Sequence, residues 1–227
     1  MCNLYSMTKP QQAVRDLARV FAQNDMAGNL PPLPGIFPDQ QAPVILNASP
    51  NNTRTMMMAR WGFPQPAPRP GERAQGGYVT NVRNTTSSYW RPQLSQAEFR
   101  CLVPVTSFCE PDMRSGKVVW TWFALDESRP LFFFAGIWRG WRGVRGAKAR
   151  PEDGNHLLFS FLTTAPNAEV TPIHPKAMPV LLLDEAARER WLTGTTDAAL
   201  ALQRPTPDGT LKIVATGEKE DVLVSAS

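Results

Sequence analysis

The second residue of this 227-residue chain is a cysteine, and its place beside the initiator methionine gives it unusual chemistry. Removal of Met1 is usual when the next residue is small, as Cys2 is. The trimmed chain would begin with an α-amine and a thiol, whose ordinary pKa values are near ~8 and ~8.5. Such an aminothiol condenses with an aldehyde, because the amine forms a Schiff base and the thiol then closes a thiazolidine ring. The alternative is that Cys2 is a small, inert packing residue.

A second polar segment is Asn81-Val82-Arg83, which follows Gly76-Gly77-Tyr78. An arginine beside an asparagine fits bidentate recognition of a phosphate group. The alternative is an ordinary surface loop.

Two single residues are candidates for proton transfer. Glu110 follows a long apolar run that starts at Arg100, so we expect it where a buried strand emerges. Partial desolvation there would raise its pKa toward neutrality, as a general acid or base requires. His174 is one of two histidines and titrates near physiological pH. A strand-ending surface glutamate and a structural histidine are the alternatives.

The segment from Trp138 to Arg150 carries five cations and no acid, with tryptophans and glycines between them. Such a segment could follow a nucleic-acid backbone and stack on unpaired bases. The alternative is the solvated tip of a basic hairpin. The net charge of +4 and a pI near 9.2 are compatible with a nucleic-acid partner but do not require one.

Several classes of protein do not fit the composition. No apolar run approaches the ~20 residues that a membrane span needs, and no basic-then-apolar start indicates a secretion signal. Three cysteines are too few for a disulfide framework and favour a reducing, intracellular compartment. Cysteines and histidines lack metal-ligand spacing, and no glycine-rich phosphate motif follows a strand.

Local patterns predict three helices and a larger number of strands. One helix is expected to begin with Thr8 as its cap and end near residues 24–28, before a rigid segment with five prolines at 29–43. A capping box at Ser95–Glu98 predicts a short helix, and Asp184 should cap a helix that Gly194 closes. Strands are expected at Pro43–Ala48, Thr53–Phe63, Cys101–Phe108, Val118–Leu125, Leu131–Trp138, Leu157–Thr164, Met178–Leu183 and Leu211–Ala215.

Many strands with few, separated helices favour an α+β fold. We expect one domain over residues 1–227, built on a curved antiparallel sheet or an open, barrel-like core with a few peripheral helices. The turn at Asp126–Pro130 is expected to join two strands as a hairpin, and the proline- and arginine-rich residues 64–75 to form a surface loop.

In order along the chain, these segments resemble the SRAP family, the SOS response-associated peptidases or abasic-site processing proteins. The resemblance spans nearly the whole chain and rests on six motifs that match the family in order. They are Met1-Cys2, Arg60-Trp61-Gly62, Asn81-Val82-Arg83, Arg100–Pro104 with Phe108–Glu110, Phe134–Trp138, and Leu162-Thr163-Thr164 with His174–Pro179.

The resemblance implies a protein that crosslinks itself to abasic sites in single-stranded DNA. Cys2, freed by autoproteolytic removal of Met1, would form a thiazolidine with the C1′ aldehyde of the lesion and shield it. Asn81 would position the N-terminal residue and the lesion, Glu110 would assist proton transfers and the removal of Met1, and His174 would help to open the deoxyribose. The DNA contacts would come from Arg83, Trp61, Thr163 and Lys176.

We further expect no cofactor and no metal, a monomer by default, no membrane contact, and a cytoplasmic location, on the nucleoid when the protein is bound to DNA. The chain departs from the family pattern beside Glu110, where Cys109 and Pro111 replace aromatic residues. The segment from His174 to Met178 is one residue longer than usual. These departures bear on affinity and sequence context more than on the reaction.

Three other functions remain open from the sequence. An N-terminal-nucleophile amidohydrolase would use Cys2 against an amide with its own amine as base. A binding module for single-stranded or modified-base DNA would bind without a covalent product. A stand-alone protease would cleave unrelated proteins. Glutamine hydrolysis, DNA binding that survives Cys2→Ala without a covalent product, and cleavage in trans distinguish them.

Overall fold

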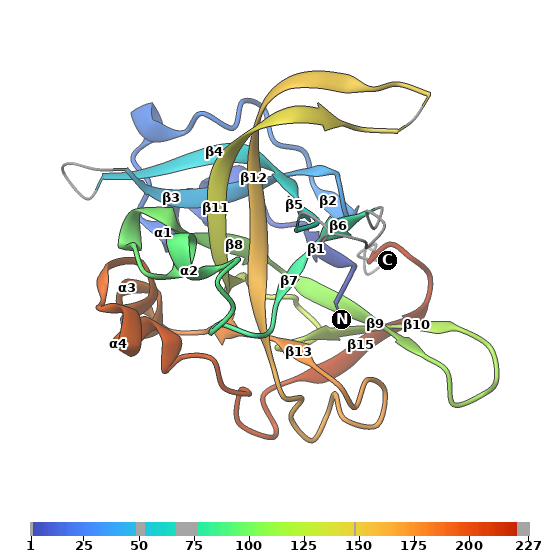
Figure 1. Ribbon diagram of the computed structural model, residues 1–227. Helices are drawn as coiled ribbons and strands as arrows, with labels where there is room; N and C mark the ends of the chain where they lie inside the picture. The colour runs from blue at the N-terminus through green and yellow to red at the C-terminus, as the bar shows by residue number, and fades with distance from the viewer. Residues whose placement is uncertain (1, 49–52, 67–76, 148, 222–227) are drawn as a thin grey trace.

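The computed structural model describes residues 2–48, 53–66, 77–147 and 149–221 of the chain. Figure 1 shows a strand-rich molecule with short helices gathered at one side. The elements in chain order are β1 (Tyr5–Met7), α1 (Gln11–Ala18), η1 (Ala22–Asn24), β2 (Leu33–Ile36), β3 (Gln41–Ala48), β4 (Thr53–Trp61), β5 (Phe63–Pro64), β6 (Tyr78–Val79), β7 (Asn81–Val82), α2 (Arg91–Leu94), η2 (Ala97–Phe99), β8 (Arg100–Val105), β9 (Ser107–Asp112), β10 (Val119–Ala124), β11 (Phe132–Arg145), β12 (Glu152–Thr164), β13 (Met178–Pro179), β14 (Leu181–Leu182), α3 (Glu185–Thr193), α4 (Thr196–Leu200) and β15 (Lys212–Gly217).

The core is a barrel in which β12, β4, β3, β8 and β11 follow one another and β11 pairs back onto β12. All neighbouring pairs in this ring are antiparallel except β12 and β4, which run parallel. The predicted α+β class and barrel-like core are therefore confirmed. The barrel is closed rather than open, because the parallel pair completes the ring.

Aromatic rings fill the barrel. The ring of Tyr5 makes edge contacts with Trp61, Phe134 and Phe161, at centroid distances of 5.2, 5.9 and 6.0 Å. All four side chains are fully buried. Since Tyr5 belongs to β1, this packing fixes the N-terminal strand directly against the barrel interior.

A second sheet, in the order β15-β10-β9-β1-β2, holds the N-terminal segment. β1 lies between β9 and β2 and is antiparallel to both. The amide of Cys109 donates to the carbonyl of Leu4 at 2.9 Å, so the pairing with β9 continues beyond the start of β1 toward Cys2. The sheet thereby brings residue 2 beside the middle of β9.

The predicted strand over residues 101–108 is two strands, because the chain turns at Thr106 from the barrel into the second sheet. The Thr106 hydroxyl bonds the hydroxyls of Ser6 and Thr8, at 2.8 and 3.2 Å. Thr8 therefore does not cap α1, whose N-cap is Pro10. The turn anchors the N-terminal strand instead.

The predicted hairpin at Asp126–Pro130 is wrong. β10 pairs with β9 and β15, whereas β11 belongs to the barrel, so this turn carries the chain from one sheet to the other. The tight turn itself is present, with Asp126 Oδ1 accepting from the amide of Ser128 at 2.7 Å and Arg129 at φ 48°.

The helices follow the predictions in part. Asp184 caps α3 by accepting from the Ala187 amide at 2.7 Å, and Gly194 ends that helix. α1 ends at Ala18, earlier than expected, because Arg19 adopts a left-handed conformation with φ 56°.

Other local predictions need correction. Ser95 ends α2 and forms no capping box, and the helix that follows is the short 3₁₀ turn η2. The proline-rich segment contains β2, and most of the predicted loop at 64–75 lies outside the described residues.

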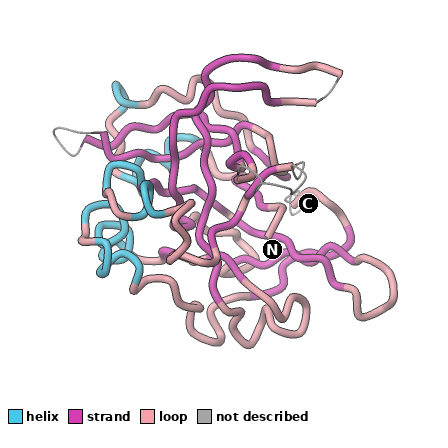
Figure 2. Tube along the Cα trace, viewed as in Figure 1, coloured by secondary structure: helices cyan, strands magenta, loops and turns pink. Residues whose placement is uncertain are grey.

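The longest hairpin is formed by β11 and β12, and it projects from one end of the barrel (Figures 1 and 2). Its two strands pair continuously from Gly136 opposite Phe161 to Arg145 opposite Glu152. The basic segment at 138–150 is thus the outer part of a hairpin. Within the described residues, no helix is long and apolar enough to cross a membrane.

Candidate active site

The structure brings Cys2 and Asn81 into direct contact. The Asn81 Nδ2 donates to the backbone carbonyl of Cys2 at 2.9 Å, and both residues are buried. The same nitrogen donates to the Thr80 hydroxyl at 2.7 Å. Asn81 therefore holds the backbone of the residue whose amine and thiol the sequence singled out.

Asn81 reaches this place because β7 lies beside β12, with Asn81 opposite Phe161 in a parallel pair. The preceding backbone is held by Trp61, whose indole Nε1 donates to the Thr80 carbonyl at 3.1 Å. Gly62 has φ +107°, and a Cβ there would lie 2.8 Å from the Cβ of Tyr78. Position 62 therefore requires glycine, because the chain there passes close to Tyr78 in a left-handed conformation.

Glu110 lies in the middle of β9, opposite Thr121 of β10, and is fully buried. The expectation that it marks the exit of a strand is wrong, because β9 continues to Asp112. The groups beside its carboxyl oxygens are the Cys2 thiol and the imidazole of His174. Burial raises the pKa of Glu110 from 4.5 to about 7, and the nearby Cys2 thiol has a smaller, opposite effect.

His174 faces this carboxyl group. Its Nδ1 lies 3.3 Å from Glu110 Oε2 and 2.8 Å from the carbonyl of Ala177. Because a carbonyl only accepts hydrogen bonds, Nδ1 carries the proton of the neutral ring. Burial lowers the pKa of His174 below its ordinary value of 6.5, which favours the neutral imidazole at pH 7.

The Cys2 thiol is kept protonated. Burial raises its pKa well above 9.0, and the Glu110 carboxylate raises it further. The site thus combines a protonated thiol, a carboxyl group that titrates near neutrality, and a neutral imidazole. These groups can pass a proton among themselves when a bond forms at Cys2.

The four predicted DNA contacts differ in exposure. Arg83 and Lys176 are exposed, whereas Trp61 and Thr163 are fully buried. The predicted contacts from Trp61 and Thr163 need correction, because in this structure neither side chain has surface to offer. Trp61 packs in the barrel and supports the backbone of Thr80 instead.

Much of the charge on the basic hairpin is already paired. Arg145 is buried, bonds Asp39 Oδ1 through Nε at 2.8 Å and lies over the ring of Tyr78 at 3.8 Å. Arg142 lies 3.8 Å from Asp153. Arg145 therefore anchors the hairpin and is not free to follow a nucleic-acid backbone, whereas the Arg142 side chain stays exposed.

Two residues of the site were missed by the sequence analysis, Thr80 and Asn3. The Thr80 hydroxyl donates to Asn3 Oδ1 at 3.0 Å, so both belong to the network around Cys2 and Asn81. The only signal in the sequence was a hydroxyl residue directly before Asn81.

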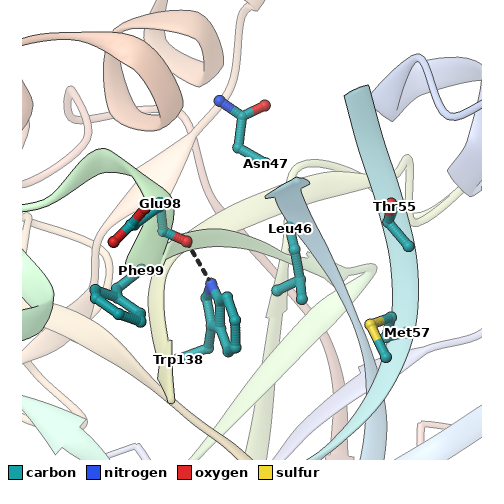
Figure 3. Close-up of a pocket in the computed structure, with 7 residues that line it drawn as sticks. All are labelled: Leu46, Asn47, Thr55, Met57, Glu98, Phe99 and Trp138. Atoms are coloured by element: carbon teal, nitrogen blue, oxygen red, sulfur yellow. Dashed lines mark hydrogen bonds between the residues drawn. The ribbon is translucent and has the colours of Figure 1, made fainter. Parts of the chain in front are cut away.

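A cavity of about 400 Å³ lies elsewhere, between β3, β4, η2 and β11 (Figure 3). Trp138 lines it, and its indole nitrogen donates to the carbonyl of Glu98 at 2.8 Å. None of the predicted site residues lines this cavity. Over the described ranges, no group of three or more His, Cys, Asp or Glu residues could hold a metal ion.

Comparison with known proteins gives one family and several related folds. The family model described as SOS response associated peptidase (SRAP) matches residues 1–219. No curated protein sequence matches the chain. A crystal structure of a protein from Bordetella bronchiseptica is 23% identical with a TM-score of 0.69, covering 95% of this chain and 98% of its own.

Two further solved structures share the fold. A protein from Bacteroides thetaiotaomicron is 17% identical with a TM-score of 0.65, covering 93% of this chain and 90% of its own. A phage-related protein from Bordetella bronchiseptica is 17% identical with a TM-score of 0.64, covering 93% and 92%.

Proposed function

Because the chain belongs to the SOS response associated peptidase (SRAP) family, we propose that it crosslinks itself through Cys2 to abasic sites in single-stranded DNA. The observation that carries the proposal is the convergence of four residues from distant parts of the chain. Asn81 holds the Cys2 backbone at 2.9 Å, and His174 lies 3.3 Å from Glu110, whose pKa responds to the Cys2 thiol.

The first step is removal of Met1, which is a hydrolysis. Water adds to the carbonyl carbon of Met1, the bond from this carbon to the Cys2 nitrogen breaks, and a carboxylate and an amine result. Glu110 accepts the proton of the attacking water and gives it to the departing nitrogen. A carboxyl group with a pKa of about 7 is suited to both transfers at neutral pH.

The second step joins the freed Cys2 to the lesion. The amine attacks the C1′ aldehyde of the ring-opened deoxyribose, and loss of one water gives a Schiff base. The thiol then adds to the same carbon while its proton passes to the nitrogen, which closes the thiazolidine. Glu110 and His174 assist these transfers, and Arg83 and Lys176 contact the DNA backbone.

The buried thiol fits this order of events. A thiol with a raised pKa is a poor nucleophile in the resting protein. Once the amine has formed a Schiff base, the thiol and the carbon that it attacks are held in the same residue. This proximity speeds the attack, so the reaction does not need a preformed thiolate. Cys2 would therefore react with an aldehyde that has entered the site rather than with thiol reagents at large.

The test mixes Met1-free protein with a single-stranded oligonucleotide that carries one abasic site. We expect a band that survives denaturing electrophoresis, with a mass equal to the sum of protein and DNA minus one water. Cys2→Ala should give no such band while retaining reversible binding. A Cys2→Ala variant that crosslinks as well as the wild type would refute the mechanism, and glutamine hydrolysis would favour the amidohydrolase.

A further inference from the structure

We propose that Thr80 is a positioning residue that fixes the orientation of the Asn81 side-chain amide, with Asn3 completing the network. The inference rests on the proposed function and adds to it a residue that acts through Asn81 rather than on the lesion itself.

The direction of the hydrogen bonds around Thr80 is set by its single hydroxyl proton. The hydroxyl donates to Asn3 Oδ1 at 3.0 Å, so toward Asn81 it acts as an acceptor. Asn81 must then present its nitrogen to Thr80, and it does so at 2.7 Å. Thr80 is 5% exposed, which keeps water from replacing it easily as the acceptor.

Both amide protons of Asn81 are used by this arrangement. One goes to the Thr80 hydroxyl and the other to the Cys2 carbonyl at 2.9 Å. If the amide were turned over, its oxygen would face these two acceptors instead and both bonds would be lost. Thr80 and the Cys2 carbonyl together therefore select one of the two amide orientations.

The consequence is that the amide oxygen of Asn81 is left available. It is buried and has no hydrogen-bond partner among the described residues. A buried acceptor without a partner is unfavourable until a donor arrives. An N–H or O–H donor in the reacting complex, such as the protonated Schiff base at Cys2, would satisfy this oxygen, and Thr80 keeps it turned toward that donor.

The experiment compares Thr80→Val, which keeps the shape but removes the hydroxyl, with Thr80→Ser, which keeps the hydroxyl. We expect Thr80→Val to slow crosslinking five- to tenfold at saturating DNA, and Thr80→Ser to stay within twofold of the wild type. In an Asn81→Ala background, Thr80→Val should have no additional effect, because Thr80 acts through Asn81.

A spectroscopic readout tests the same inference without activity. In the wild-type protein both Nδ2 protons of Asn81 are hydrogen-bonded, so the side-chain amide should exchange slowly with solvent. Thr80→Val should shift its resonance and make one proton exchange faster, whereas Thr80→Ser should not. Thermal unfolding of each variant separates this effect from a loss of folding.

The two proposals fail in different ways. A wild-type protein that gives no crosslink overturns the proposed function, and the Asn81 amide resonance still decides the role of Thr80. An unchanged resonance in Thr80→Val overturns the positioning role. The role is also overturned if Thr80→Val slows crosslinking equally with and without Asn81.

Discussion

Replacing Glu110 by glutamine should stabilise the protein, and the gain should depend on pH. Burial raises the pKa of Glu110 from 4.5 to about 7. Each tenfold change in an equilibrium constant corresponds to about 1.4 kcal/mol, so ionising this carboxyl group in the folded protein costs about 3 kcal/mol more than in the unfolded chain. Glutamine has a similar shape and carries no charge at any pH.

The sign follows from proton binding. Between about pH 4.5 and pH 7 the folded protein holds a proton on Glu110 that the unfolded chain has released. The stabilising contribution of Glu110 is therefore fully present below about pH 4.5 and is lost as pH rises through about 7. Above pH 7 we expect Glu110→Gln to exceed the wild type in unfolding free energy by up to about 3 kcal/mol.

The assay is urea unfolding of both proteins at pH 4.5, 6 and 8. Subtracting the wild-type value at each pH removes the contributions of groups that titrate alike in both proteins. Glu98→Gln is the matched control, because Glu98 is exposed and should change stability little at any pH. A Glu110→Gln difference that is the same at pH 4.5 and pH 8 would refute the raised pKa of Glu110 in the folded protein.

Two further predictions separate DNA contacts from supporting residues. Arg83→Ala and Lys176→Ala should each weaken DNA binding and reduce the slope of the logarithm of the binding constant against the logarithm of salt concentration by about 1. Trp61→Phe should leave this slope unchanged and lower the free energy of unfolding by about 1–3 kcal/mol. A Trp61→Phe variant with a smaller slope would contradict this division. Gly62→Ala should cost more than about 1 kcal/mol, because a side chain at φ +107° is strained and its Cβ would lie 2.8 Å from Tyr78; an unchanged midpoint of thermal unfolding would speak against it.

Local signals in the sequence predicted local structure in part: the cap expected at Asp184 is confirmed, whereas the caps expected at Thr8 and Ser95 are wrong. The cap residue Asp184 and the terminal Gly194 place α3 correctly, because capping depends only on residues a few positions apart. The longer strands were found from their apolar runs, whereas β1 and β2 were missed. β11 also extends beyond its apolar part to Arg145. The outer residues of β11 are held in the strand by their pairing with β12, although their composition does not predict a strand.

Long-range pairing was not predictable from the same signals. The turn at Asp126–Pro130 has the composition of a hairpin, yet the strands on either side pair with other partners. The parallel contact of β12 with β4 joins residues about a hundred positions apart, and nothing in either strand specifies it alone. Trp61 lies in that parallel pair, opposite Phe159, and Thr163 lies opposite Pro179 of β13, so the surroundings of both residues depend on long-range pairing.

The candidate site shows a similar division. Cys2, Asn81, Glu110 and His174 were found from residue type and family resemblance, and the structure places them together. Their roles remain predictions. The network around Thr80 could not be found, since it depends on how close Asn3 comes to β7 after folding.

The strand order of the second sheet has a consequence for the time at which Cys2 acquires its neighbours during synthesis. β1 has no place to insert until β9 has been made, because it lies between β9 and β2. His174 follows more than sixty residues after Glu110. A nascent chain therefore carries its N-terminal cysteine without the carboxyl group and imidazole beside it until most of the chain has left the ribosome. If Glu110 assists the removal of Met1 as proposed, that route becomes available only once β9 and the segment with His174 have joined β1.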